Sequence, residues 1–357
     1  MIIISKICLA LTLSLAFASI SMAEVQTRKI PVLSQILDDH GNPAEDISGI
    51  ACLNGLGPSP VCLLINDEDR EGQLARFGSD GISPTARFKL LTKSTQASAL
   101  GSPPSENKCP AGGDSFDDLD GEAVAADSAK KVFYVAASHG CSRKKGKFPI
   151  SSFLLARVAM TNSGDAATVD TTYRLSDALN RGDLAPFFAH ALKEQNGDSD
   201  ASGLNIEGIA VHGSRMYVGL RAPLIGGKAV IVVANVDNLF KDGKERLAGP
   251  FTEPMLVSLG SHAGIRDLAA LPDGRLLILS GPTLNQAIGS QVFLFDPEKP
   301  EEIPNPVAAI DGSLGKPEAI LYISHDKSNL KFLVLSDSSP NGSPVEYSVS
   351  IGPKNLR

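Results

Sequence analysis

The feature that most constrains the fold of this chain is a motif that occurs five times along it. Each copy has an acid or a serine, a short run of small and apolar residues, a turn rich in Gly, Asp, Asn or Ser, and a second apolar run. This order is typical of two strands joined by a tight connection. The copies begin at Ser48, Glu122, Glu207, Asp267 and Glu318.

Further apolar segments follow each copy and complete a larger unit. Third strands are predicted at "QLARF", "SFLLARVAM", "AVIVVANV", "QVFLFDP" and "VEYSVSI", and fourth strands at "ARFKLL", "TTYRLS", "PMLVSLG" and "PNPVAAI". The fifth copy lacks a fourth strand, but "RKIPVLSQIL" precedes the first copy and can supply it. We therefore predict an all-β fold, a β-propeller of five four-stranded blades closed by the N-terminal strand.

The spacing of the copies indicates insertions. The first three intervals exceed the roughly 40 to 50 residues of a typical blade. We expect the extra residues near 92–116 and 175–203, the second with a helical pattern over 175–195. A sixth blade hidden in these segments is the main alternative, whereas a β-sandwich would not need five similar units.

The first residues resemble a targeting segment. Lys6 precedes an apolar run from Ile7 to Ile20, and the small residues Ser21 and Ala23 follow. This pattern predicts a signal peptide, residues 1–23, cleaved after Ala23. Residues 24–357 would then form a single propeller domain. No later run approaches the roughly 20 apolar residues of a membrane helix, so we expect a periplasmic or secreted protein without membrane insertion.

Four cysteines remain after this cleavage: Cys52, Cys62, Cys109 and Cys141. An even number in an oxidising compartment predicts two disulfides, for which three pairings are possible. A Cys52–Cys62 bond would close one strand-loop-strand unit, and a Cys109–Cys141 bond would tie a loop to the end of another. Zinc is disfavoured because the cysteines lack a Cys-x-x-Cys spacing and the six His are scattered.

The charge of the chain limits its partners. The formal net charge is −7, and there is no basic stripe. This balance argues against nucleic acid and anionic membranes, and leaves an unidentified small molecule, glycan or protein as the partner.

The repeated acids predict a site. The first strand of each propeller blade lines the central channel, so Glu122, Glu207, Asp267 and Glu318 should converge near one mouth, with Ser48 completing the ring. Like charges at short range need a cation or bases between them. The candidate ligand-binding residues are therefore the four acids together with Arg221, Arg266, His139 and Asp337.

Two interpretations of these acids compete. They are candidate metal ligands for Ca²⁺, or they lock one blade to the next through backbone N–H groups and Arg side chains. His139 is a candidate base, but its place beside Cys141 favours a loop position near a disulfide.

The segments "DLDGEAVA", "LNIEGIAV", "GLRAPLIGGKAVIV" and "GIRDLAALPDGRLLILSGP" resemble the DUF3616 family of exported bacterial proteins of undefined function. More distantly, the repeats are similar to exported propellers described as phytase-like or SdiA-regulated. The resemblance implies a propeller with an acidic site that Ca²⁺ could occupy, and it implies no particular reaction.

Two functions follow as hypotheses. The first is an exported propeller that binds a ligand or partner at an acidic, Arg-containing channel mouth. The alternative is a Ca²⁺-assisted hydrolase of phosphate or other esters, with Arg221 or Arg266 holding the anionic group. The chain has no nucleophile elbow, no His-Glu-x-x-His motif and no dinucleotide fingerprint, so no catalytic residue is assigned and binding is favoured.

Overall fold

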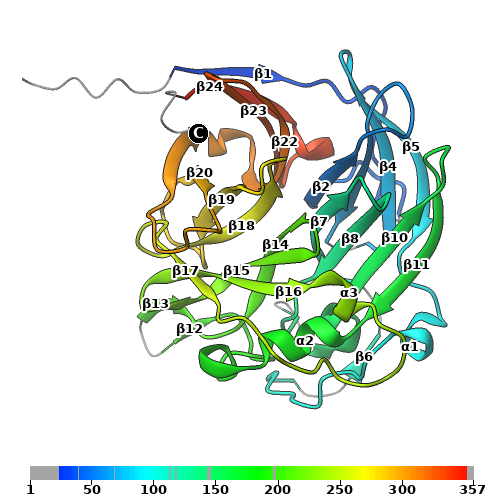
Figure 1. The fold of residues 1–357 in the computed structure, drawn as a ribbon, viewed down its shortest axis with the longest axis vertical. Coiled ribbons are helices and arrows are strands. Elements are labelled where there is room, and N and C mark those ends of the chain that lie inside the picture. The colour runs from blue at the N-terminus through cyan, green and yellow to red at the C-terminus, as the bar shows by residue number, and fades with distance from the viewer. Residues whose placement is uncertain are drawn as a thin grey trace, which may run out of the picture.

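The computed structural model describes residues 24–38, 40–67, 69–111, 114–116, 119–142, 146–195 and 198–351. The predicted signal peptide lies outside these residues. The described part contains five four-stranded antiparallel sheets arranged around a common centre, which is a five-bladed β-propeller (Figure 1). The prediction of an all-β, five-bladed propeller is confirmed, and the six-bladed alternative is wrong.

We number the blades along the chain, with the innermost strand first. Blade 1 consists of β2 (Ile47–Leu53), β3 (Val61–Asn66), β4 (Glu71–Gly78) and β5 (Gly81–Lys89). Blade 2 consists of β7 (Gly121–Asp127), β8 (Val132–Ala137), β10 (Leu155–Met160) and β11 (Ala166–Thr172). Blade 3 consists of β14 (Asn205–His212), β15 (Arg215–Ile225), β16 (Lys228–Asn235) and β17 (Met255–Val257). Blade 4 consists of β18 (Ala263–Ala270), β19 (Leu276–Pro282), β20 (Ser290–Phe295) and β21 (Asn305–Ile310).

Blade 5 joins the two ends of the chain. Its inner strands are β22 (Lys316–His325), β23 (Asn329–Asp337) and β24 (Val345–Ser350), and its outer strand is β1 (Val25–Lys29). β1 runs antiparallel to β24 from the Val25–Val349 pair to the Lys29–Val345 pair. Figure 1 shows this closure as the blue strand beside the red one. The predicted closure by an N-terminal strand is therefore present, but the strand is Val25–Lys29 and shares only Arg28 and Lys29 with the predicted segment.

Burial explains why the second strands are almost continuously apolar. All six residues of β8 are buried, and so are the first five of β3. A strand covered on both faces by neighbouring blades needs apolar side chains on both faces. β1 is exposed along its whole length because it lies at the outer edge of its sheet.

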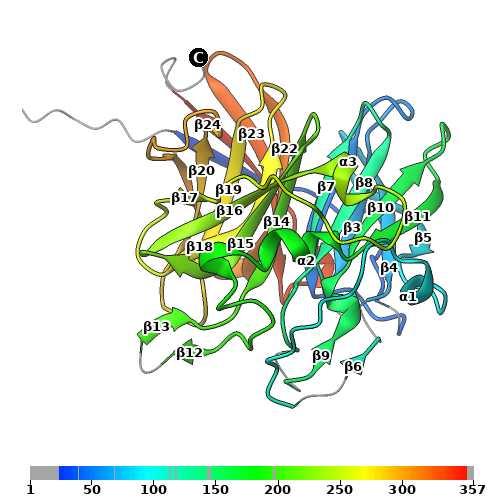
Figure 2. The same ribbon diagram turned by 60° about the horizontal axis from the view of Figure 1, so that its bottom comes forward.

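The segments predicted as insertions hold short elements outside the blades. They include α1 (Thr95–Ser98), α2 (Arg174–Leu179), β6 (Asp114–Ser115) and the two-stranded sheet β12–β13 (Glu194–Gln195 with Asp198–Ala201). β6 pairs with β9 (Phe148–Pro149), which lies in the β8–β10 connection, outside both predicted insertions. Figure 2 shows both small sheets on the same side of the propeller. The predicted helix over 175–195 is mostly wrong. Gly182 and Ala189 have positive φ angles of 48° and 55°, and Pro186 lacks a donor, so the helix ends at Leu179.

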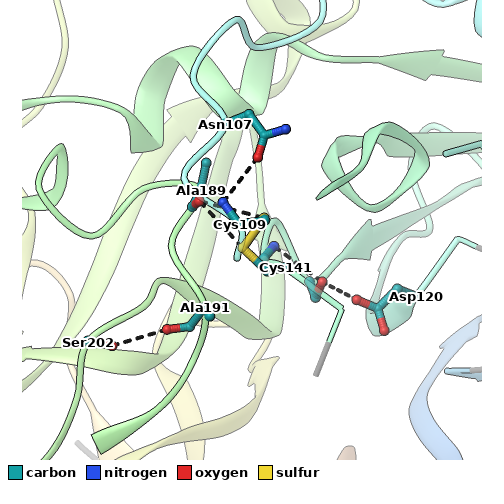
Figure 3. The surroundings of a disulfide bond; sticks show 9 residues. Asn107, Cys109, Asp120, Cys141, Ala189, Ala191 and Ser202 are labelled. Atoms are coloured by element: carbon teal, nitrogen blue, oxygen red, sulfur yellow. Dashed lines mark hydrogen bonds between the residues drawn. A yellow bond between two sulfur atoms is a disulfide. The ribbon is translucent and has the colours of Figure 1, made fainter. Parts of the chain in front are cut away.

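Both predicted disulfides form, and the pairs are Cys52–Cys62 and Cys109–Cys141. Cys52 and Cys62 are direct partners on β2 and β3. Cys109, which precedes blade 2, is bonded to Cys141 in the connection between β8 and β10, and Ala189 lies against the bond (Figure 3). In the described part of the chain, none of the helices has the length and apolar character needed to cross a bilayer.

Candidate functional site

Each innermost strand carries a β-bulge at the same place near its start. The register between first and second strands skips one residue there in all five blades. A bulge leaves one residue out of the ladder and redirects its side chain, and it often does so beside functional sites. The skipped residues, which we call the polar ring, are Ser48, Glu122, Glu207, Arg266 and Glu318.

The polar ring differs in one member from the ring expected from the sequence. In blade 4 the bulged residue is Arg266, and Asp267 occupies the next position. The other blades have Gly49, Ala123, Gly208 and Ala319 at that next position. When the repeats are aligned by their acids, Asp267 of blade 4 takes the place that Arg266 occupies in the structure. This one-residue error arises because the residue types do not show where a bulge lies. A cation, not a fourth carboxylate, therefore belongs to the ring.

Arg266 lies between two carboxylates of neighbouring blades. Its Nη2 is 3.2 Å from Glu207 Oε2, and it also forms a direct ion pair with Glu318. Arg221 Nη1 is 2.9 Å from Glu207 Oε1, and its Nε donates to the Thr283 carbonyl at 2.8 Å. The side chains of these four charged residues are at most 12% exposed. Two cations thus balance two anions in a buried network that spans blades 3, 4 and 5.

Asp267 connects blade 4 to blade 5 through the backbone. Its Oδ1 accepts a hydrogen bond from Leu268 N and its Oδ2 accepts one from Ile320 N, both at 2.7 Å. Complete burial raises the pKa of Asp267 well above its usual value, and the nearby charge of Glu207 acts in the same direction. Ser48 Oγ makes a comparable link, donating to the Gly121 carbonyl of blade 2 at 2.6 Å. These contacts match the interpretation in which the polar residues lock neighbouring blades.

Glu122 is the polar-ring residue of blade 2. It is buried beside a small polar space of about 30 Å³ that Asp120 and Asn205 also line. Cys141, from the connection between β8 and β10, and Leu192, from the segment that precedes blade 3, also line this space. Figure 3 shows Asp120 and Cys141 in this region. The polar end of the channel is therefore covered by the insertions at this blade.

His139 and Asp337 are not part of the polar ring. His139 is fully buried with a φ of 56°, its Nδ1 is 3.0 Å from the Ala137 carbonyl, and its ring packs edge-on against Phe153. Burial lowers the pKa of His139 to about 4. Asp337 pairs with Lys316 at 3.3 Å on blade 5. The structure thus brings together Arg221, Arg266, Glu207 and Glu318, with Asp267 beside them, and it places His139 and Asp337 outside the polar ring.

The polar ring does not fit a Ca²⁺ ion. Calcium takes six to eight oxygen ligands that are not already engaged by cations. Here arginines pair with Glu207 and Glu318, and two backbone N–H groups occupy the carboxylate of Asp267. Among the described residues, no group of three or more His, Cys, Asp or Glu side chains could hold a metal ion.

The opposite half of the channel holds a cavity of about 700 Å³. All five innermost strands line it, so it lies on the propeller axis. Its base is a ring of apolar residues that lie just beyond the bulges, which we call the floor ring: Ile50, Val124, Ile209, Leu268 and Ile320. The next residues along the strands are Ala51, Ala125, Ala210, Ala269 and Leu321. Four of these are alanines, whose short side chains leave the axis open.

Turns between first and second strands form the mouth of this cavity. Asn54, His212 and Pro272 line it, together with the 127–130 turn. Lys130 Nζ is 2.8 Å from Asp237 Oδ1, so an ion pair links blades 2 and 3 at the rim. This cavity was not predicted from the sequence, because the candidate site was placed at the repeated acids. The signal was the alanine that lies three positions after the bulged residue in four of the five repeats.

The fold and the channel define a five-bladed β-propeller with an axial cavity. The family model named DUF3616, protein of unknown function, matches residues 150–343, and the chain belongs to this family. No curated protein matches the chain.

Three solved structures share a distant likeness with the chain. The chain is 14% identical to the major allergen Mala s 1 of Malassezia sympodialis, with a TM-score of 0.40 over 88% of this chain and 82% of that one. It is 10% identical to an exo-β-1,3-galactanase from Phanerochaete chrysosporium, with a TM-score of 0.44 over 90% of this chain and 64% of that one. It is 14% identical to a calcium-binding regucalcin of Agrobacterium tumefaciens, with a TM-score of 0.38 over 90% of this chain and 96% of that one.

Proposed function

We propose that this protein is an exported propeller that binds a small molecule in its axial cavity. The observation that carries the proposal is the cavity of about 700 Å³ lined by all five innermost strands. Ligand pockets typically measure about 300 to 1,000 Å³ and are lined mainly by apolar groups with a few polar ones. The polar ring, which the sequence favoured as the site, instead supports the cavity from below.

The repeated motif supports this division of the channel. In each repeat the bulged polar residue precedes a floor-ring residue, which in four of the five repeats precedes an alanine. The ion pairs hold neighbouring strands together, and the alanines keep space open above them. A rigid wall of strands lowers the cost of ordering a site around its ligand.

Export is the second part of the proposal. Two disulfides are typical of proteins that fold in oxidising compartments. The apolar run from Ile7 to Ile20, followed by the cleavage pattern at Ala23, supports the same location. A periplasmic or secreted binding protein would meet its ligand outside the cytoplasm.

A single fluorophore can test ligand binding, because the chain contains no Trp. Phe77 lines the cavity, and Phe77→Trp would report its occupancy. We expect some members of a small-molecule library to shift both the emission of this variant and the melting temperature of the unmodified chain. Ala269→Leu, which fills part of the cavity, should weaken those responses, whereas Ala86→Leu on the exposed side of β5 should not. A library without any response, or responses that Ala269→Leu leaves unchanged, would contradict the proposal.

A further inference from the structure

We propose that the ligand of this cavity is an uncharged amphiphile, an aliphatic chain that carries an alcohol, ester or amide head. This inference rests on the proposed binding function and adds the chemical class of the ligand. It follows from three properties of the cavity: its side chains, the positions of its charges and the strand edges along its wall.

The side chains of the cavity favour a hydrocarbon chain. The floor ring is aliphatic, and alanines from four blades form the wall above it. Among the described residues that line the cavity, only Phe77 and Tyr322 carry a phenyl or phenol ring. Nucleobases bind on aromatic platforms, and few such rings are present here. An aliphatic chain needs only close contact with apolar walls.

The charges near the cavity disfavour an ionised ligand. The charged residues of the lining, Asp127, Lys130 and Asp237, belong to the rim. Lys130 pairs with Asp237, and Asp127 Oδ1 accepts hydrogen bonds from the backbone N–H groups of Ala129 and Lys130 at 3.0 Å. Below the floor ring, Glu207 and Arg266 pair with each other. A charge carried into the cavity would therefore lose its hydration without gaining a counterion.

The strand edges provide uncharged hydrogen-bonding groups. Each innermost strand is the last of its sheet, so one of its edges follows the channel. At the polar end, side chains meet such edge groups: Asp267 accepts from Ile320 N, and Ser48 donates to the Gly121 carbonyl. Backbone N–H and C=O groups along the cavity can bond a hydroxyl, ester or amide in the same way. Because they carry no net charge, they suit a neutral head.

The inference predicts how affinity depends on chain length. Burial of each CH₂ contributes about 0.8 kcal/mol, which corresponds to a roughly fourfold lower Kd. We expect this gain for each added carbon until the chain fills the cavity. An anionic or cationic head on the same chain should raise the Kd at least about tenfold, because the charge stays at the rim or loses its hydration.

The experiment is a titration of the Phe77→Trp variant with 1-alkanols from pentanol to nonanol. The alkanoates and alkyltrimethylammonium ions of equal chain length provide the charged series, and galactose provides a polar neutral compound. Ile303→Trp, on a side chain that is 80% exposed, is the matched control for adsorption to the surface. The inference is supported if the alkanols give a saturable response in Phe77→Trp and none in Ile303→Trp. Their Kd should fall roughly fourfold with each added carbon, and both charged series should bind more weakly.

The outcomes separate this inference from the function on which it rests. Equal or tighter binding of a charged series or of galactose would overturn the ligand class and leave small-molecule binding in place. Alkanols that shift Ile303→Trp as strongly as Phe77→Trp would overturn the class as well, because they would bind the surface. If neither these series nor the library gives a response at the cavity, the proposed function fails together with the inference.

Discussion

Removal of the Arg266 guanidinium tests whether the polar ring locks the propeller. In Arg266→Ala, Glu207 keeps its pair with Arg221, but Glu318 loses the cation beside it. The Arg266 side chain is 5% exposed and that of Glu318 is 12% exposed. Breaking a buried pair from one side typically lowers the free energy of unfolding by about 3 to 5 kcal/mol.

This loss corresponds to a measurable change in melting temperature. The unfolding entropy of a chain of this length is about 0.7 kcal/mol/K, so the melting temperature should fall by about 4 to 7 °C in calorimetry. Urea unfolding measures the free energy independently. Arg215→Ala is the control: Arg215 pairs with Glu298 at the surface, where the side chains are 54% and 69% exposed, and it should change stability by less than about 1 kcal/mol.

A second variant separates the lost pair from the lost volume. Arg266→Ala combined with Glu318→Gln removes the uncompensated charge, and it should be more stable than Arg266→Ala alone. The reasoning is refuted if Arg266→Ala destabilises no more than Arg215→Ala. It is also refuted if the double variant loses as much free energy of unfolding as the two single variants, Arg266→Ala and Glu318→Gln, lose together.

Three further predictions concern protons, sulfur and metal. The pKa of His139 falls from 6.5 to about 4 in the folded protein, so unfolding takes up a proton between these values and stability should decrease by up to about 3 kcal/mol as the pH falls from 6.5 to 4. Urea titrations should show this slope reduced in His139→Asn, and an unchanged slope would contradict it. Replacing Cys109 and Cys141 by Ser should lower the free energy of unfolding by about 3 to 4 kcal/mol, because the bond closes a loop between residues 32 positions apart. Urea unfolding measures this loss, with the intact protein under oxidising conditions as the reference. Because arginines pair with Glu207 and Glu318, Ca²⁺ and EDTA should leave the melting temperature unchanged, and a Ca²⁺-dependent rise lost in Glu207→Gln would show that the ring binds metal after all.

The architecture could be predicted from the sequence because the repeat and the strand pattern are local signals. Five copies of one strand-turn-strand unit, each with a third strand, leave few alternatives to a ring of blades. The closing strand followed from the missing fourth strand of the last copy. The helix expected over 175–195 was predicted from local composition alone. It does not form over this range because Gly182 and Ala189 adopt positive φ angles in the folded chain.

The site was only partly predictable, since it depends on register. The sequence correctly indicated that arginines would lie among the acids. It did not reveal the bulge that places Arg266, and not Asp267, in the polar ring, because bulges depend on the pairing of two strands. Likewise, the alanines above the floor ring are ordinary strand residues in the sequence. Only the arrangement of five strands around one axis turns them into the wall of a cavity.

The pairing of β1 with β24 has a consequence for how the chain is made. The strand that leaves the ribosome among the first must wait for one of the last before the ring can close. Until β24 emerges, β1 lacks its partner strand, and the growing chain carries an unpaired strand that can pair with other chains. A chaperone that holds the chain extended until synthesis ends would protect this edge. Recombinant production should accordingly be more sensitive to deletion of the five residues of β1 than to loss of the same number from an exposed turn.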